Sequence, residues 1–166
     1  MSDLRSLVVE MLQNRGVPLW EVAELVFRLQ ADHQRDLSVE ECLRSVWEVL
    51  SKREVQHALL TGMVLDELAE KGLLPEPLQS IVASDEPLFG VDETLALGIT
   101  NVYGTIGLTN FGYLDKVKSG VIGKLVAAEE EGAVHTFLDD LVAGLAAAAA
   151  AKLAHNRIPR EVEAAG

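Results

Sequence analysis

The chain has 166 residues, of which 49% are hydrophobic, and it carries 14 Lys and Arg against 26 Asp and Glu, a formal net charge of −12. So high an apolar fraction at this length can bury a core, which excludes disorder as a description of the whole chain. The negative charge argues against nucleic acid as the partner, because affinity for a phosphate backbone comes from clustered Lys and Arg. We therefore expect one globular domain that does not bind nucleic acid.

Cysteine content and hydropathy predict where the protein resides. Cys42 is the single cysteine, so no disulfide can form within the chain, as is usual in a reducing compartment. The N-terminus lacks the basic and apolar regions of a secretory signal. The uncharged stretch 94–114 is long enough to cross a bilayer, but its four Thr, two Asn and four Gly indicate burial in protein. We expect a cytoplasmic protein, with peripheral contact at the inner face of the membrane.

Helical periodicity dominates the first half of the chain and predicts helices over 3–15, 19–30, 38–50, 51–70 and 78–83. Ser38 and Glu41 have the spacing of a capping box. Trp20 belongs to the apolar stripe of the second helix, and Cys42 and Trp47 to that of the third, where Cys42 is expected as a core thiol. No stretch alternates as a strand does, so the sheet content is predicted to be zero.

Two further helices, over 91–114 and 136–155, are expected to form a central, buried pair rich in Gly and Ala. Small or hydroxyl side chains recur on one face of the first: Thr94, Gly98, Asn101, Thr105, Thr109 and Gly112. The second contains the alanine tract 146–151, which would allow the two backbones to approach closely. The stripe predicts either tight helix packing or a polar cleft. The fold class is therefore all-α, a single-domain multi-helix bundle over 1–166, with an N-terminal helical layer at 1–72 and the site on 91–156.

Paired carboxylates open both of these helices. Asp92 and Glu93 lie in a first turn, where the helix dipole alone could favour them. Asp139 and Asp140 stand in a segment with no other charge from 133 to 151, so partial burial would force two like charges together unless a cation or hydrogen-bond donors compensate. Oxygen ligands suit Mg²⁺ or Mn²⁺ better than Zn²⁺. Helix capping is the alternative explanation of both pairs.

The cations of this region follow the first helix. Lys116, Lys118 and Lys124 lie in a predicted loop beside Asp115, and they could hold an anionic group next to a metal. Carboxylates with a metal and lysines for a phosphate are what phosphate-ester hydrolysis requires, although a solvated loop would look the same. His135 precedes Asp139 by four residues, so it is a candidate metal ligand if the helix extends that far.

Three short motifs, in order along the chain, resemble those of the phosphatidylglycerophosphatase A family. Asp139-Asp140-Leu141-Val142-Ala143-Gly144 is similar to its D-D-x-x-A-G motif, Asp115-Lys116-Val117-Lys118 to its D-x-x-K-P segment, with Ser119 in place of the proline, and Asp92-Glu93 to its D-E pair. The family's N-terminal K-x-x-P-G-T-x-G-S segment has no counterpart. The chain most resembles a soluble, low temperature requirement C-like branch.

The resemblance implies a mostly helical fold and magnesium-dependent removal of the terminal phosphate from phosphatidylglycerophosphate, which gives phosphatidylglycerol. It also implies that Glu93, Asp139 and Asp140 bind the metal and that Lys118 lies near the phosphate.

Together these observations predict a phosphatase that acts on a phosphorylated lipid or another phosphomonoester. The predicted residues are Asp115 and Asp140 for catalysis, Asp92, Glu93, Asp139 and Asp140 for Mg²⁺ or Mn²⁺, and Lys116, Lys118, Asn101 and Asn110 for the substrate. The alternative is a non-catalytic helical interaction protein that retains a divalent-metal site. Either protein could form a homo-oligomer through the small-residue stripe.

Overall fold

The computed structural model describes residues 3–156, and every regular element in that range is helical. The elements are α1 (Leu4–Asn14), α2 (Leu19–Gln30), α3 (Val39–Leu50), α4 (Arg53–Glu70), α5 (Leu78–Ala83), α6 (Val91–Thr100), the short 3-10 helix η1 (Asn101–Tyr103), α7 (Thr105–Val117), α8 (Val121–Glu129) and α9 (Leu138–Asn156). The all-α prediction is confirmed for these residues.

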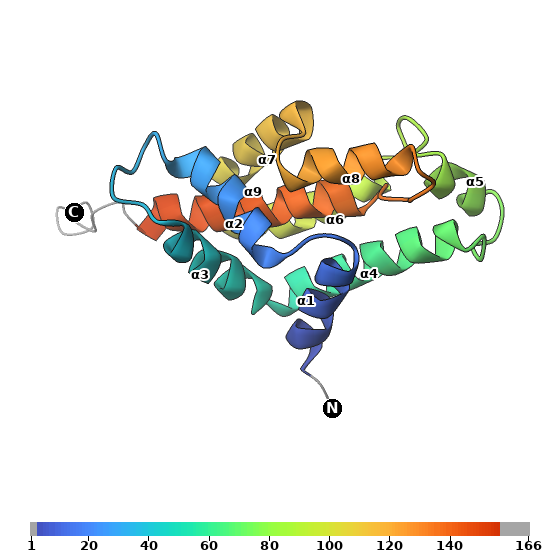
Figure 1. Ribbon diagram of the computed structural model, residues 1–166, viewed down its shortest axis with the longest axis horizontal. Coiled ribbons are helices and arrows are strands. Elements are labelled where there is room, and N and C mark those ends of the chain that lie inside the picture. The colour runs from blue at the N-terminus through green and yellow to red at the C-terminus, as the bar shows by residue number, and fades with distance from the viewer. Residues whose placement is uncertain (1–2, 157–166) are drawn as a thin grey trace, which may run out of the picture.

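Helix α9 forms the axis of the molecule, and α2, α3, α4, α6, α7 and α8 pack around it (Figure 1). Every residue from Leu138 to Ala151 is buried. A helix that is apolar on all sides belongs in a core, and alanine side chains let neighbouring helices approach from every direction. The alanine tract is thus core, as expected, but the central element is one helix and not a pair.

The predicted helix over 91–114 is wrong, because the chain breaks at residues 101–104. Gly104 has φ +81° and ψ −160°, a conformation that L side chains rarely adopt. The chain then turns into α7, whose Gly107 lies so close to α6 that a Cβ would stand 2.9 Å from the Thr100 carbonyl oxygen. The predicted loop that holds the lysines is also wrong in part, since residues 121–129 form α8.

The stripe of small residues does not face α9. Thr94, Asn101, Thr105 and Thr109 are exposed, and nothing lies within 4 Å of a Cβ built on Gly98 or Gly112. The close contact between α6 and α9 is made elsewhere, because a Cβ on Gly144 would stand 2.9 Å from the Ala96 carbonyl oxygen. The stripe is therefore surface on both sides of the break, at Thr94 and Gly98 in α6 and at Thr105, Thr109 and Gly112 in α7.

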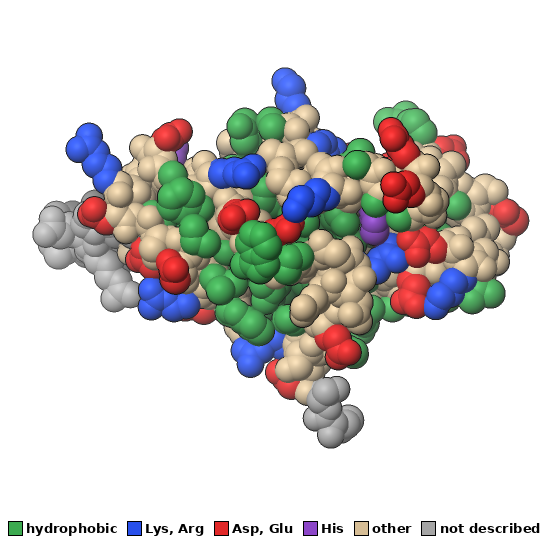
Figure 2. Space-filling view, viewed as in Figure 1, with side chains coloured by type: hydrophobic (Ala, Val, Ile, Leu, Met, Phe, Trp, Pro, Cys, Tyr) green, Lys and Arg blue, Asp and Glu red, His purple; other side chains and the backbone are tan. Residues whose placement is uncertain are grey.

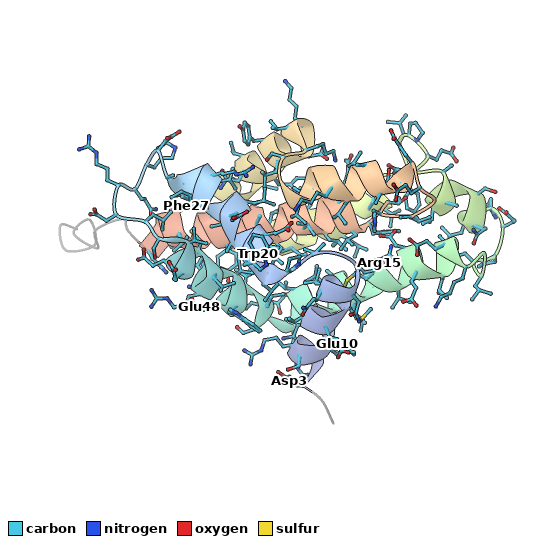
Figure 3. All side chains as sticks on the ribbon, viewed as in Figure 1. Asp3, Glu10, Arg15, Trp20, Phe27 and Glu48 are labelled. Carbon is cyan, nitrogen blue, oxygen red and sulfur yellow. The ribbon has the colours of Figure 1, made fainter. Side chains whose placement is uncertain are left out.

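The N-terminal layer follows its predicted pattern more closely. The Ser38–Glu41 capping box forms in full, and Cys42 is completely buried. Trp20, in contrast, is 54% exposed and Trp47 38%, so neither is core. Trp20 lies at the centre of the face in view (Figure 3), within a group of hydrophobic side chains (Figure 2). Among the described helices, none combines the length and the apolarity that crossing a membrane requires.

Candidate functional site

An acidic cavity of about 190 Å³ lies where the loop after α5 meets α6, α7 and α9. We call it the acidic cavity. Seven carboxyl groups and one lysine line it: Asp85, Glu86, Asp92, Glu93, Asp115, Asp139 and Asp140, with Lys118. Three separate segments of the chain, 85–93, 115–118 and 139–140, contribute these groups. Such a concentration of negative charge in one concave place predicts a site for a positively charged ligand.

The Lys118 side chain holds this group of carboxylates together. Its Nζ donates to Asp115 Oδ1 at 2.7 Å and to Asp139 Oδ2 at 3.1 Å, and it lies 3.8 Å from Asp140 Oδ1. Lys118 directs its ammonium across the cavity from the C-terminal end of α7, where its backbone adopts a left-handed conformation with φ +51°. One ammonium therefore serves three carboxylates and leaves the cavity with a large negative charge.

Burial perturbs the pKa values in the cavity. Burial is the main cause that raises the pKa of Asp139 to about 6, against the opposing charge of Lys118. The pKa of Asp140 is raised further, by burial and then by repulsion from Asp139. Burial opposes the charge of Lys118 too, but the hydrogen bond with Asp115 and the charge of Asp139 outweigh it and raise the pKa of the ammonium. A further cation would stabilise both aspartates in their charged form.

One face of α4 holds the start of α9, which carries Asp139 and Asp140. At four-residue spacing, Gly62, Asp66 and Glu70 contact successive parts of the chain entering α9. A Cβ on Gly62 would overlap Leu141 Cδ1. These contacts set the position of α9 along α4, and so the position of its two aspartates.

Asp66 is the central member of this face and is completely buried. Its carboxyl oxygens accept from the Phe137 N–H at 3.0 and 3.2 Å and from the Leu138 N–H at 2.9 Å. These N–H groups have no partner within a helix, so Asp66 caps α9 from another element. Burial raises the pKa of Asp66 to about 7, although the two N–H donors oppose the shift.

Beside Asp66, a polar network fixes the loop before α9. Arg15, which follows α1 (Figure 3), donates to Glu70 Oε2 at 2.7 Å and to the Val134 carbonyl oxygen at 2.6 Å. Glu70 Oε1 accepts from the Val134 N–H at 2.8 Å. His135 precedes α9, and its Nδ1 lies 3.2 Å from Arg15 Nη2. His135 does not line the acidic cavity, so its side chain supports the loop.

Six of the residues predicted for the site meet in the acidic cavity: Asp92, Glu93, Asp115, Lys118, Asp139 and Asp140. The other three do not line it. Lys116 and Asn101 are exposed, and Asn110 lines a different cavity, between α2, α7 and α9. The ordered acidic motifs therefore identified residues that are far apart in sequence and adjacent in space.

Sequence reasoning missed Asp66, Asp85 and Glu129. Asp85 lines the cavity from the loop after α5, and burial with the nearby charge of Asp92 raises its pKa. Glu129 is the last residue of α8, and burial and then the charge of Asp139 raise its pKa to about 7. The four-residue spacing of Gly62, Asp66 and Glu70 was a signal that could have drawn attention to Asp66.

The carboxylate oxygens that line the cavity suit a hard divalent cation, and their combined negative charge exceeds the single positive charge of Lys118. Across residues 3–156, no three His, Cys, Asp or Glu side chains converge on one point as metal ligands do. In the arrangement described, the Lys118 ammonium provides the positive charge between Asp115, Asp139 and Asp140.

Fold and site together define an all-α protein whose buried central helix presents two aspartates to an acidic cavity. The sequence profile of the phosphatidylglycerophosphatase A family matches residues 12–155, and the chain belongs to this family. It is 52% identical to the Bacillus subtilis protein YpjQ over 94% of this chain and 87% of that one. It is 31% identical to the Methanocaldococcus jannaschii protein MJ1330, over 74% and 91%.

Solved structures share the fold. The low temperature requirement C protein of Listeria monocytogenes is 53% identical and superimposes with a TM-score of 0.89, covering 93% of this chain and 97% of that one. A Bacillus stearothermophilus protein gives a TM-score of 0.90 at 52% identity, over 95% and 97%.

Proposed function

We propose that this protein is a magnesium-dependent phosphatase that hydrolyses a phosphomonoester, with phosphatidylglycerophosphate or a related phosphorylated compound as substrate. The observation that carries the proposal is the meeting of Asp139, Asp140, Asp92 and Lys118 in one cavity. Membership of the phosphatidylglycerophosphatase A family supports the reaction class. Phosphatidylglycerophosphate, after which the family is named, is the first substrate to be tested.

In this proposal Asp92, Asp139 and Asp140 hold the metal, and Glu93 contributes at the exposed rim of the cavity. Bound Mg²⁺ would offset phosphate charge and polarise a phosphoryl oxygen. Asp139 and Asp140 must lose their protons to act as ligands, so Mg²⁺ affinity should rise with pH. Measuring the protons released on Mg²⁺ binding therefore detects binding independently of phosphatase activity.

Lys118 and Asp115 perform the remaining tasks. The ammonium of Lys118 donates hydrogen bonds to a phosphoryl oxygen, as it does to carboxylate oxygens in the absence of substrate. Asp115 is partly exposed and lies within hydrogen-bond distance of Lys118, so it can take a proton from an attacking water molecule. The water oxygen bonds to phosphorus, the bond from phosphorus to the alcohol oxygen breaks, and the alkoxide takes a proton from solvent.

Calorimetric titration with MgCl₂ and phosphate release from phosphatidylglycerophosphate in detergent micelles test the proposal. We expect Asp139→Asn and Asp140→Asn to weaken Mg²⁺ binding at least about tenfold and phosphate release at least about a hundredfold, with unchanged helical content. Glu131→Gln, at an exposed acid outside the cavity, is the matched control and should change neither. Phosphate release that survives both a chelator and the Asp variants would contradict the proposal.

A separate observation favours a second candidate, a non-catalytic interaction protein. The uncharged stripe of α6 and α7 is exposed, with open space at Gly98 and Gly112. Such a face suits helix packing against another protein molecule. Absence of Mg²⁺ binding at millimolar metal, together with self-association in sedimentation, would favour this function over the phosphatase.

A further inference from the structure

A second cavity, of about 520 Å³, lies between α2, α7 and α9. Its polar lining residues are Gln30, His33, Gln34 and Asn110, and we call it the amide cavity. Leu29, Ile106 and Ala154 form its apolar walls. Ala154 follows Asp140 by 14 residues on α9, or about 21 Å along the helix axis, so this cavity is separate from the acidic one.

Two of the residues that line the amide cavity each have one buried polar atom that lacks a partner. Gln34 is only 8% exposed. Its Nε2 donates to Gln30 Oε1 at 3.2 Å, but its Oε1 accepts no hydrogen bond. Asn110 Nδ2 is also buried and donates to no group within the described chain. An unpaired buried donor or acceptor costs about 1–3 kcal/mol, so a ligand that pairs both atoms recovers this free energy.

The chemistry of the walls restricts what the ligand can be. No Asp, Glu, Lys or Arg side chain is among the lining residues, and His33 is the one titratable group among them. A charged ligand would lose hydration there without gaining an opposite charge. The volume is within the range of small-molecule sites, roughly 300–1,000 Å³. The cavity therefore suits a neutral ligand with the dimensions of a small ring compound and with some apolar surface.

We propose that the amide cavity binds a small neutral heterocycle that presents a lactam or carboxamide edge, of the size of a nucleobase or nucleoside. Such an edge carries an N–H donor for Gln34 Oε1 beside a carbonyl acceptor for Asn110 Nδ2. Pairing between amide side chains and heterocycle edges uses the same complementarity by which Asn and Gln recognise bases. The proposal does not depend on phosphatase activity, because the two cavities share no residue.

Titration of ¹⁵N-labelled protein with uridine, followed through side-chain amide signals, tests this inference. We expect saturable shifts of the Gln34 and Asn110 NH₂ signals at up to millimolar uridine. 3-Methyluridine, whose lactam N–H is replaced by a methyl group, should bind at least about tenfold more weakly, because Gln34 Oε1 would meet no donor.

Asn110→Ala should weaken uridine binding about tenfold, whereas Asn101→Ala, at an exposed asparagine outside the cavity, should leave it unchanged. A spectrum otherwise like that of the unmodified protein would show that Asn110→Ala remains folded. A cavity that holds only water would give no saturable shift with uridine or with nicotinamide, and this result would overturn the proposal. Equal binding of uridine and 3-methyluridine would overturn it as well.

Discussion

At the scale of single residues, Lys118 has the largest electrostatic role in the acidic cavity. It comes from the end of α7, where a left-handed backbone directs its ammonium toward the aspartates of α9. Lys124, a few residues later, pairs instead with Glu21 at 2.9 Å and is mostly exposed. Lys118 and Lys124 therefore have different surroundings, which could not be inferred from the residue type.

We predict that Lys118→Met lowers phosphate release about a hundredfold, because the hydrogen-bond donor to the phosphoryl oxygen is lost. Lys124→Met is the matched control and should change the rate less than about twofold, since Lys124 pairs with Glu21 and does not line the acidic cavity. Steady-state assays on both variants would measure this. Equal rates for the two variants would exclude the assigned role of Lys118.

The carboxyl group of Asp66 is a second residue with a distinct role, because it caps a helix from a different element. We expect Asp66→Ala to lower the free energy of unfolding by about 2–3 kcal/mol, since two N–H groups at the start of α9 lose their acceptor. Asp66→Asn keeps one oxygen acceptor and should lose less. Urea unfolding of both variants checks this prediction, and an equal loss would argue against the cap.

At the scale of elements, the arrangement of α6 and α9 depends on where glycine allows backbones to meet. Gly144 lies against the backbone of Ala96, whereas Gly98 faces open space. Both are inside helices, and both belong to the segments that the sequence suggested would pair. The sequence pattern does not show which glycine makes the contact, because periodicity identifies a face but not its partner.

Gly144→Ala should lower the free energy of unfolding by about 1–3 kcal/mol, because the added Cβ would stand 2.9 Å from the Ala96 carbonyl oxygen and force the backbones apart. Gly98→Ala should be neutral or stabilising by up to about 1 kcal/mol, since alanine favours a helix and meets no atom there. Denaturant unfolding measures both. A destabilised Gly98→Ala variant would show that the face of α6 is not open.

At the scale of the whole molecule, several carboxyl groups have raised pKa values in the folded state. Burial raises those of Asp66 and Glu129 to about 7, and it acts in the same direction on Asp139 and Asp140. Between pH about 4 and 7, the folded protein therefore retains protons that the unfolded chain releases. These groups favour folding less as the pH rises through this range.

We accordingly predict that, without divalent metal, the free energy of unfolding falls between pH about 5 and 7, by at most about 1.4 kcal/mol per pH unit for each group. Asp66→Asn should reduce this slope, and Glu131→Gln should not. Urea unfolding at the two ends of this pH range gives the free energies of unfolding to be compared. A free energy of unfolding that rises with pH over this range would contradict the burial of these carboxyl groups.

Much of this protein is determined by local sequence. The helical class, the capping box at Ser38, the burial of Cys42 and of the alanine tract follow from periodicity and from side-chain size. The three short motifs also identified six residues that share one cavity, and the cost of burying two adjacent carboxylates singled out Asp139 and Asp140 among them.

Tertiary structure alone decided the rest. The chain breaks at Gly104, α6 meets α9 through Ala96 and Gly144, the small-residue stripe is surface, and α9 is the single central axis. Asp66 caps α9 from α4, and Asn110 lines a cavity about 20 Å from the aspartates, by the rise of α9. The physical reason is the same in each case. Periodicity and propensity act within one element, whereas these contacts join groups far apart in the chain, whose meeting depends on how the helices pack.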